Sequence, residues 1–211
     1  MNFYEYVKQF DSGKLLPLVE EFYTLQGEGF QTGKAAYFIR IGGCDVGCAW
    51  CDSKLSWNPE IFPPVLVNDI IQHALNYPGR AIVVTGGEPS LYPLDYLTSE
   101  FKKKGFQTFI ETSGAYALTG QWDWICLSPK RQQPPADGIH LKADELKVII
   151  SDKSDLDWAE ENSKLVKSSC QLFLQPEWSK FGTNIQWLVD YVMNNPKWRI
   201  SLQSHKFMHI P

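Results

Sequence analysis

The sequence predicts an α/β protein whose parallel sheet forms a partial, open β/α barrel of about six core strands. Three observations predict this class. Short apolar, β-branched or aromatic runs recur along the chain, a polar turn follows each run at once, and amphipathic helical patterns separate several of them. Strands that alternate with helices favour a parallel sheet. A closed eight-unit barrel typically needs about 250 residues, so a chain of 211 residues favours an open one.

The expected strands are, in chain order, "YFIRI" from Tyr37, "AIVV" from Ala81, "QTFI" from Gln107, "WICL" from Trp124, "LKVII" from Leu146, "QLFL" from Gln171 and "WRISL" from Trp198. The turns that follow them are "GGCDVGC", "TGGEPS", "ETSG", "SPK", "SDKSD", "QPEW" and "QSHK". Taken singly, such turns are ordinary loop chemistry. In parallel α/β folds, however, functional groups gather at the carboxyl ends of the strands, so we expect a site where these turns meet.

Amphipathic helices are expected at residues 65–77 ("VLVNDIIQHALNY"), 94–105 ("LDYLTSEFKKKG") and 184–195 ("NIQWLVDYVMNN"). Their apolar residues recur at helical spacing. The second pattern ends in a lysine-rich turn and a glycine, which is typical of a helix C-terminus. The third starts at Asn184, whose side chain suits an N-cap, so we expect that helix to begin there.

Composition and charge favour one folded domain over residues 1–211 and exclude several classes of protein. The chain is 44% hydrophobic and 14% aromatic, as in ordinary globular domains. Its formal charge is 20 − 24 = −4 with scattered lysines and arginines, so no nucleic acid partner is expected. No apolar run reaches membrane-spanning length, and "MNFYEYVKQF" lacks the apolar core of a signal peptide. We therefore expect a cytoplasmic protein without a membrane partner.

Three of the five cysteines stand close together in "CDVGCAWC", at Cys44, Cys48 and Cys51. This odd, clustered set argues against a disulfide framework and for metal or redox chemistry. A structural zinc site uses four protein ligands. The other cysteines and the histidines are distant in sequence, so no fourth ligand is evident. Catalytic zinc with an open position stays conceivable. In a 4Fe-4S cube each iron is usually bound by one thiolate, so three cysteines leave one iron free for another ligand. Cys126 and Cys170 border apolar runs and are expected to pack in the core.

The motif "CDVGCAWCD" resembles the signature loop of the radical S-adenosylmethionine (SAM) superfamily. In that superfamily SAM chelates the free iron of a 4Fe-4S cluster. The turn "TGGEP" resembles the superfamily's glycine-glycine-glutamate turn, which holds the methionine amino group. Glycines allow a close backbone approach, and a carboxylate suits an ammonium group.

The segment "EFYTLQGEGFQTGKAAYFIRIGGCDVGCAWCDSK" closely resembles the family of 7-carboxy-7-deazaguanine synthases, as do "TGGEPS", "ETSG", "SPK", "QPEW" and "QSHKFMHIP" in the same order. The resemblance covers residues 20–211 and leaves residues 1–19 as an N-terminal extension. It implies conversion of 6-carboxy-5,6,7,8-tetrahydropterin to 7-carboxy-7-deazaguanine, a carbon–nitrogen lyase reaction towards queuosine and related deazapurines. A 5′-deoxyadenosyl radical would remove hydrogen from C6 of the pterin, the ring would contract with loss of ammonia, and SAM would be regenerated.

The resemblance also implies roles for the positions that match. The 4Fe-4S cluster would be bound by Cys44, Cys48 and Cys51. SAM would be bound by Trp50, Gly87, Glu88, Ser113, Ser128, Pro129, Lys130, Gln175, Pro176, Glu177 and Trp178. The pterin would be bound by Leu25, Gln26, Gly27, Glu28, Arg40, Thr85, His205 and Pro211. Mg²⁺ prefers hard oxygen ligands and would take Ser53, at a position where threonine is common. The terminal carboxylate of similar enzymes reaches the substrate, so a C-terminal tag is expected to be harmful.

Simpler interpretations stand beside these roles. Arg40 could point its charge into water from the strand, and His205 could be a surface residue near a frayed end. Glu28 could be ordinary turn polarity between glycines, and Asp52 could cap a helix.

Two other functions remain as alternatives. A glycyl-radical-enzyme activase shares the three-cysteine loop, but its protein substrate would leave "LQGEG" without a purpose. A non-enzymatic zinc-binding module would combine the three cysteines with a distant histidine. The resemblance further implies a homodimer and an external electron donor such as flavodoxin.

Overall fold

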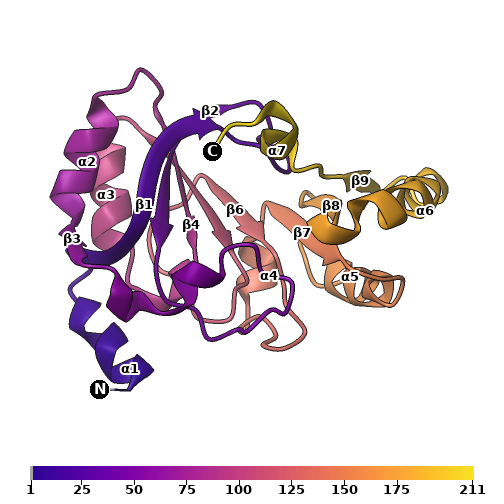
Figure 1. Ribbon diagram of the computed structural model, residues 1–211, viewed down its shortest axis with the longest axis horizontal. Coiled ribbons are helices and arrows are strands. Elements are labelled where there is room, and N and C mark those ends of the chain that lie inside the picture. The colour runs from indigo at the N-terminus through magenta and orange to yellow at the C-terminus, as the bar shows by residue number, and fades with distance from the viewer. Residues whose placement is uncertain (1) are drawn as a thin grey trace.

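The computed structural model describes residues 2–211 and contains a nine-stranded sheet in the order β3-β1-β2-β4-β5-β6-β7-β8-β9. From β2 to β9 every neighbouring pair is parallel. These strands are β2 (Ala35–Ile41), β4 (Ala81–Gly86), β5 (Gln107–Thr112), β6 (Trp124–Leu127), β7 (Glu145–Ile150), β8 (Gln171–Pro176) and β9 (Trp198–Ile200). The sheet curves but does not close, because its edge strands β3 and β9 do not pair (Figure 1). The expected strands and the open parallel barrel are confirmed.

Two strands that the sequence did not predict extend one edge of the sheet. They are β1 (Leu15–Leu25) and β3 (Pro64–Leu66), and both pairings that they make are antiparallel. Pro17 and the adjacent carboxylates Glu20 and Glu21 interrupt any apolar alternation along β1. Proline is confined to edges in sheets, and Pro17 pairs with Pro64 of the edge strand β3. Tertiary pairing, more than local propensity, therefore makes β1 a strand.

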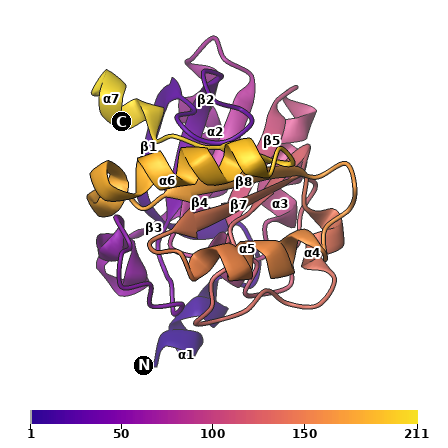
Figure 2. The same cartoon turned by 90° about the vertical axis from the view of Figure 1, so that its right-hand side faces the viewer.

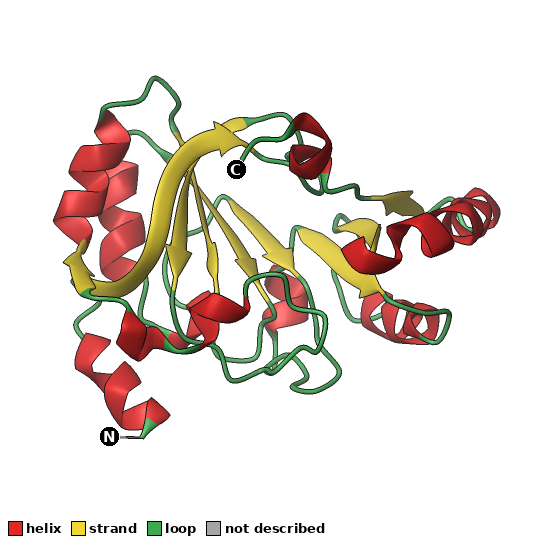
Figure 3. Cartoon of the chain, viewed as in Figure 1, coloured by secondary structure: helices red, strands yellow, loops and turns green. Residues whose placement is uncertain are grey.

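The main helices lie on the outer, convex side of the sheet (Figures 1 and 3). They are α2 (Val67–Leu75), α3 (Asp95–Lys103), α5 (Asp155–Ser163) and α6 (Phe181–Asn194). Figure 2 shows α5 and α6 lying across β7 and β8. The short helices are α1 (Phe3–Val7), α4 (Ile139–Lys142) and α7 (Ser204–Met208), and single 3-10 turns cover Lys8–Phe10, Lys54–Trp57, Pro59–Ile61, Pro89–Leu91 and Trp178–Lys180. No helix in residues 2–211 is long and apolar enough to cross a membrane.

The expected start of the third helix was wrong. Helix α6 begins at Phe181, so Asn184 lies inside it and is not its N-cap. The Asn184 side-chain amide is buried and donates to the carbonyl oxygens of Ile150, at 3.2 Å, and Ser151, at 2.9 Å. Asn184 therefore ties α6 to the end of β7. Helix α5 was not predicted, because its sequence is mostly polar and lacks a clear apolar face.

The two faces of the sheet differ because side chains alternate along each strand. Outward apolar residues of β2, β4 and β5 pack with α2 and α3, and those of β7 and β8 pack with α5 and α6. On the inner face, Phe38, Val83 and Phe109 belong to a smaller apolar cluster. Two positions further along the same strands come Arg40, Thr85 and Glu111. On β2, β4 and β5 the inner face is therefore apolar at the amino end and polar at the carboxyl end, whereas β7 begins on that face with the buried carboxylate of Glu145.

The N-terminal segment packs against the turn that follows β2. Phe10 is 1% exposed, and its ring lies edge-on to Tyr92 with centroids 5.6 Å apart. The Tyr92 hydroxyl donates to the Gly42 carbonyl at 2.7 Å. From α1, the Tyr4 hydroxyl donates to Asp45 Oδ2 at 2.8 Å. The segment before β1 therefore braces the loop that carries the clustered cysteines.

The packing of Phe10 predicts that Phe10→Ala lowers the free energy of unfolding by about 3 kcal/mol or more, because it removes a fully buried ring. Urea denaturation of the metal-free protein measures the change. Met193→Ala is the control, since Met193 is 76% exposed and its truncation should change the same quantity by less than about 0.5 kcal/mol. Equal effects of the two substitutions would contradict a structural role for the N-terminal segment.

Candidate active site

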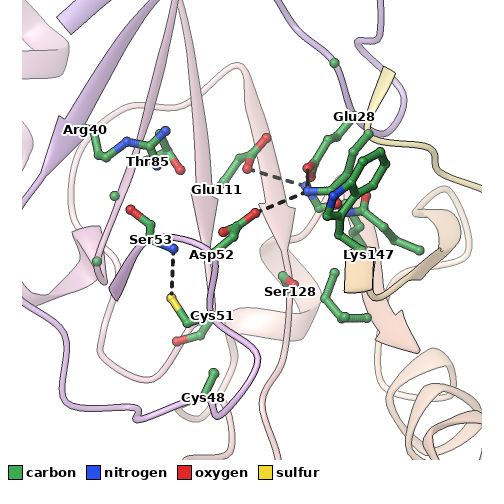
Figure 4. A pocket seen from close by; sticks show the side chains of 18 of the residues that line it. Glu28, Arg40, Cys48, Cys51, Asp52, Ser53, Thr85, Glu111, Ser128 and Lys147 are labelled. Carbon is green, nitrogen blue, oxygen red and sulfur yellow. Dashed lines mark hydrogen bonds and ion pairs between the residues drawn. The ribbon is translucent and has the colours of Figure 1, made fainter. Parts of the chain in front are cut away.

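A cavity of about 570 Å³ opens at the carboxyl ends of the parallel strands (Figure 4). The turns after β2, β4, β5, β6 and β8 line it, together with the loop after β1, the inner face of β7 and helix α7. Every residue predicted for the site lines this cavity except Pro129. Pro129 is buried nearby, where its carbonyl oxygen accepts a bond from the Trp158 indole at 3.4 Å. Pro129 thus fixes the turn between Ser128 and Lys130 rather than facing the cavity.

The three clustered cysteines come from the loop after β2, which is held close to the turn after β4. The Glu88 amide donates to the Gly43 carbonyl, and the Gly87 amide donates to the Ile41 carbonyl, both at 2.8 Å. A Cβ on Gly87 would stand 2.2 Å from the Gly43 oxygen and 3.0 Å from Cys44 Cβ. Only glycine allows this approach. The "TGGEP" turn therefore seats the cysteine loop.

The three thiols of the loop fit a 4Fe-4S cluster. Cys44, Cys48 and Cys51 are free and line the same cavity. A 4Fe-4S cube takes each thiolate at a different corner and leaves the fourth corner open for another ligand. Burial raises the pKa of Cys44 to about 11 and also raises the pKa of Cys48, so both are neutral thiols until a metal displaces their protons.

Glu88 is the most buried carboxylate of the site, at 2% exposed. One carboxylate oxygen accepts from the Ser90 amide at 2.9 Å and from its hydroxyl at 2.6 Å. The other accepts from the Ser113 amide at 2.8 Å, and the hydroxyls of Thr112 and Ser113 also donate to Glu88. These donors occupy the acceptor positions of a carboxylate. Glu88 therefore links the turn after β4 to the turn after β5.

Lys130 brings a positive charge to the side of the cavity formed by the turn after β6. Its ammonium group lies 5.6 Å from the centroid of the Trp50 ring and donates to Ser128 Oγ at 2.7 Å. Burial lowers the pKa of Lys130, and the nearby Cys48 opposes that shift. The arrangement places a cation and an aromatic face beside the cysteine loop.

The "LQGEG" loop after β1 is fastened to the C-terminal helix. The Ser204 amide and hydroxyl donate to the Gly27 carbonyl at 2.9 and 2.8 Å. A Cβ on Gly27 would stand 2.2 Å from Nδ1 of His205, so the loop and α7 touch at this residue. His205 is half-buried and lines the cavity, and burial lowers its pKa below the ordinary value of 6.5. His205 is thus neutral at neutral pH and is not a frayed surface residue.

Glu28 is also not simply a polar residue of a solvated turn. Its carboxylate forms an ion pair with Lys147 and accepts from the Gln203 amide at 2.9 Å. Lys147 also pairs with Glu111, at 3.4 Å (Figure 4). Gln26 donates to Glu111 at 2.9 Å.

The sequence reasoning did not name Lys147, Glu111 or Gln203 as site residues. A signal existed for two of them. Glu111 opens "ETSG", and Lys147 interrupts the apolar run "LKVII".

The remaining polar residues lie on the other side of the cavity. Arg40 and Thr85 are direct partners across β2 and β4 and both line it. The Arg40 side chain is 25% exposed, and its Nε donates to Glu20 Oε1 at 2.7 Å, which fixes the guanidinium plane. Ser53 lines the cavity as well. Asp52 makes no helix cap; Lys206 donates to it at 3.2 Å.

Comparison with known proteins identifies the family. Residues 38–124 match the model of the radical SAM superfamily. The 7-carboxy-7-deazaguanine synthase of Flavobacterium psychrophilum is 55% identical over 201 residues, which is 95% of each chain. The enzyme of the same name from Synechocystis sp. is 43% identical, over 92% of this chain and 93% of its own. The chain belongs to the 7-carboxy-7-deazaguanine synthase family.

The fold agrees with this membership. The crystal structure of QueE from Escherichia coli superposes with a TM-score of 0.80 at 30% identity, over 94% of this chain and 98% of that one. As a 7-carboxy-7-deazaguanine synthase, the chain is a radical SAM lyase of the queuosine pathway that acts on a small molecule. Its cofactors are a 4Fe-4S cluster, SAM and Mg²⁺. The predicted family, reaction class and cofactors are confirmed.

The contact between Gly27 and His205 predicts that Gly27→Ala raises the KM for the pterin roughly tenfold or more, since the methyl group must displace the imidazole. Steady-state kinetics of the reconstituted enzyme measures the change. Gly182→Ala is the control, because a Cβ there meets nothing within 4 Å, its φ is not in the left-handed region and it does not line the cavity, so KM should not change. A KM unchanged in Gly27→Ala would contradict the described packing of the loop on α7.

Proposed function

We propose that this cavity converts 6-carboxy-5,6,7,8-tetrahydropterin to 7-carboxy-7-deazaguanine and ammonia, with the cysteine loop and the "LQGEG" loop facing one another across it. The observation that carries the proposal is their convergence, since three free thiols and the ionised Glu28 line a single cavity. A radical reaction needs its cofactor and its substrate in contact and shielded from water.

In this proposal the thiolates of Cys44, Cys48 and Cys51 would hold the 4Fe-4S cluster, and SAM would bind beside it. When bound, the cluster and SAM would supply the radical chemistry, which removes a hydrogen atom from C6 of the pterin and returns one to the rearranged product. The SAM pocket is formed by Trp50, Gly87, Glu88, Ser113, Ser128, Lys130, Gln175, Pro176, Glu177 and Trp178, with Pro129 setting the shape of its turn. Because Glu88 already accepts bonds from Ser90, Thr112 and Ser113, we assign it the task of fixing the backbone around the methionine ammonium.

The pterin is recognised at two ends. The amino-pyrimidinone edge presents N–H groups, and the Glu28 carboxylate accepts hydrogen bonds from them. The backbone groups of Leu25, Gln26 and Gly27 lie next to Glu28 and can form further hydrogen bonds with the same edge. The substrate carboxylate lies opposite this edge, and the terminal nitrogens of Arg40 are suited to bind it as a fork. Thr85, neutral His205 and Pro211 complete the lining. The Ser53 hydroxyl is proposed to ligate Mg²⁺, which prefers hard oxygen atoms.

The proposal also includes a single domain, a cytoplasmic location, an external electron donor and a homodimer. A single domain over residues 1–211 is supported because the strands of the described chain belong to a common sheet. A cytoplasmic setting is supported by the free state of Cys44, Cys48, Cys51, Cys126 and Cys170. An external electron donor such as flavodoxin rests on the family resemblance, and the exposed Gly47 and Ala49 leave this side of the cysteine loop open to solvent. The homodimer rests on the family resemblance, and sedimentation of the reconstituted protein tests it.

The test is anaerobic turnover. Wild-type protein reconstituted with iron and sulfide, then given SAM, dithionite, Mg²⁺ and the pterin, is expected to form 7-carboxy-7-deazaguanine detectable by mass spectrometry. Cys51→Ala is expected to lose both the product and the broad iron-sulfur absorbance, because one corner of the cube loses its ligand.

Cys170→Ala is the matched control, since Cys170 lies in the apolar cluster beneath α5 and α6 and should keep its iron. Deoxyadenosine without the deazapurine would retain the radical chemistry and reject the pterin as substrate. Neither compound from fully loaded wild-type protein would overturn the proposed function.

A further inference from the structure

We propose that Lys147 is a positioning residue that holds Glu28 charged and aimed at the amino-pyrimidinone edge of the pterin, and thereby sets substrate affinity. The inference rests on the proposed function and adds a residue that neither the family motifs nor the sequence reasoning assigned.

Lys147 is a buried charge that makes its ion pairs with Glu28 and Glu111 on the inner face of the sheet. It lies in the middle of β7, its side chain is 4% exposed, and its neighbours along the inner face are Glu145 and Ile149. Burying an ammonium group costs free energy even when it is paired, and well-packed apolar replacements of buried ion pairs are often neutral or stabilising. Fold stability alone therefore gives little reason for this group of buried charges, formed by Lys147, Glu28 and Glu111.

The contacts of Lys147 join three separate parts of the site. Its ammonium group pairs with Glu28 from the loop after β1 and with Glu111 at the end of β5. Gln26 reinforces both partners, because its amide donates to Glu111 at 2.9 Å and its carbonyl accepts from the Glu28 amide at 3.0 Å. Gln203, just before α7, donates to Glu28. One cation thus fixes the orientation of the carboxylate that faces the substrate.

Electrostatics gives the lysine a second effect on Glu28. Burial raises the pKa of Glu28, whereas Lys147 and the amides of Gln203 and Gln175 lower it, so that it falls to about 2. Burial lowers the pKa of Lys147 itself, but Glu111 and Glu28 outweigh this and raise it well above its usual value. The lysine is therefore charged, and Glu28 stays ionised, across the whole neutral range.

The other charged groups around Glu28 cannot replace Lys147. Glu111 and Glu145 are carboxylates, and His205 is neutral because burial lowers its pKa. Asp52 reaches Glu28 only through Gln203, and Lys206 pairs with Asp52. Without Lys147, a largely buried Glu28 would stand among other acids and take up a proton near neutral pH. A protonated carboxyl presents a donor to the donors of the pterin edge, and unpaired buried polar groups weaken binding strongly.

The experiment compares Lys147→Met with wild type in the reconstituted holoenzyme, measuring kcat and KM for the pterin between about pH 6 and pH 8.5. We expect KM to rise roughly tenfold or more at pH 7.5, with a smaller change in kcat. The ratio of mutant to wild-type KM should increase as pH falls, because Glu28 gains a proton in the mutant only. Taking the ratio removes the titration of His205 and of the pterin, which both proteins share.

Lys147→Arg keeps the cation and is expected to restore a ratio that does not vary with pH. Lys147→Gln removes the charge while retaining hydrogen bonds, and it decides the case if the methionine variant does not load its cluster. The surface control is Lys102→Met, which breaks an ion pair with Asp123 of 2.7 Å far from the cavity and should leave KM unchanged.

The inference is overturned if wild-type enzyme turns over the pterin while Lys147→Met and Lys147→Gln keep KM within about twofold at every pH. A wild-type enzyme that forms no product contradicts the proposed function instead, so the two failures are distinguishable. A tenfold KM increase that does not vary with pH would reduce Lys147 to a packing role and would also reject the proposal.

Discussion

Parallel strands end together, and the organisation of this molecule depends on that constraint. From β2 to β8 each strand delivers its following turn to the same edge of an open sheet, so residues far apart in sequence share one cavity. The cysteine loop after β2 and the "TGGEP" turn after β4 touch because their strands are neighbours, and Gly87 lets their backbones meet. The antiparallel β1 adds the "LQGEG" loop beside β2 and completes the opposite wall. The order and direction of the strands thus bring the loops of the site together.

The inner face of the sheet holds charges that a closed, apolar barrel would exclude. Phe38, Val83 and Phe109 fill its base, and Glu28, Glu111 and Lys147 lie above them. Burying these groups opposes folding, and mutual pairing offsets much of that cost. These buried groups hold their charges in fixed positions before the substrate binds, and precise recognition usually requires such preorganisation. Glu88 shows the same logic without a cation, because backbone amides and hydroxyls alone satisfy it.

Much of the fold could be predicted because apolar runs followed by polar turns report parallel strands directly, and each expected strand is present. The features that the sequence did not predict correctly have physical causes. Strand β1 depends on pairing with β2 rather than on its own pattern, α5 lacks an apolar stripe, and Asn184 binds the end of β7 instead of capping α6. The cysteines and "LQGEG" were found through motifs. Lys147 was not, because a buried ion pair is a tertiary contact whose partners, Glu28 and Glu111, lie far away in sequence.

The central claim is that the cluster loop and the pterin loop serve one cavity, so that hydrogen passes directly between substrate and cofactor. Turnover of pterin carrying deuterium at C6 tests this most directly, with mass spectrometry of SAM and 5′-deoxyadenosine after the reaction. The account predicts deuterium in these nucleosides, in step with formation of 7-carboxy-7-deazaguanine. Product formed with unlabelled nucleosides would contradict it, because the hydrogen would then have left the pterin by another path.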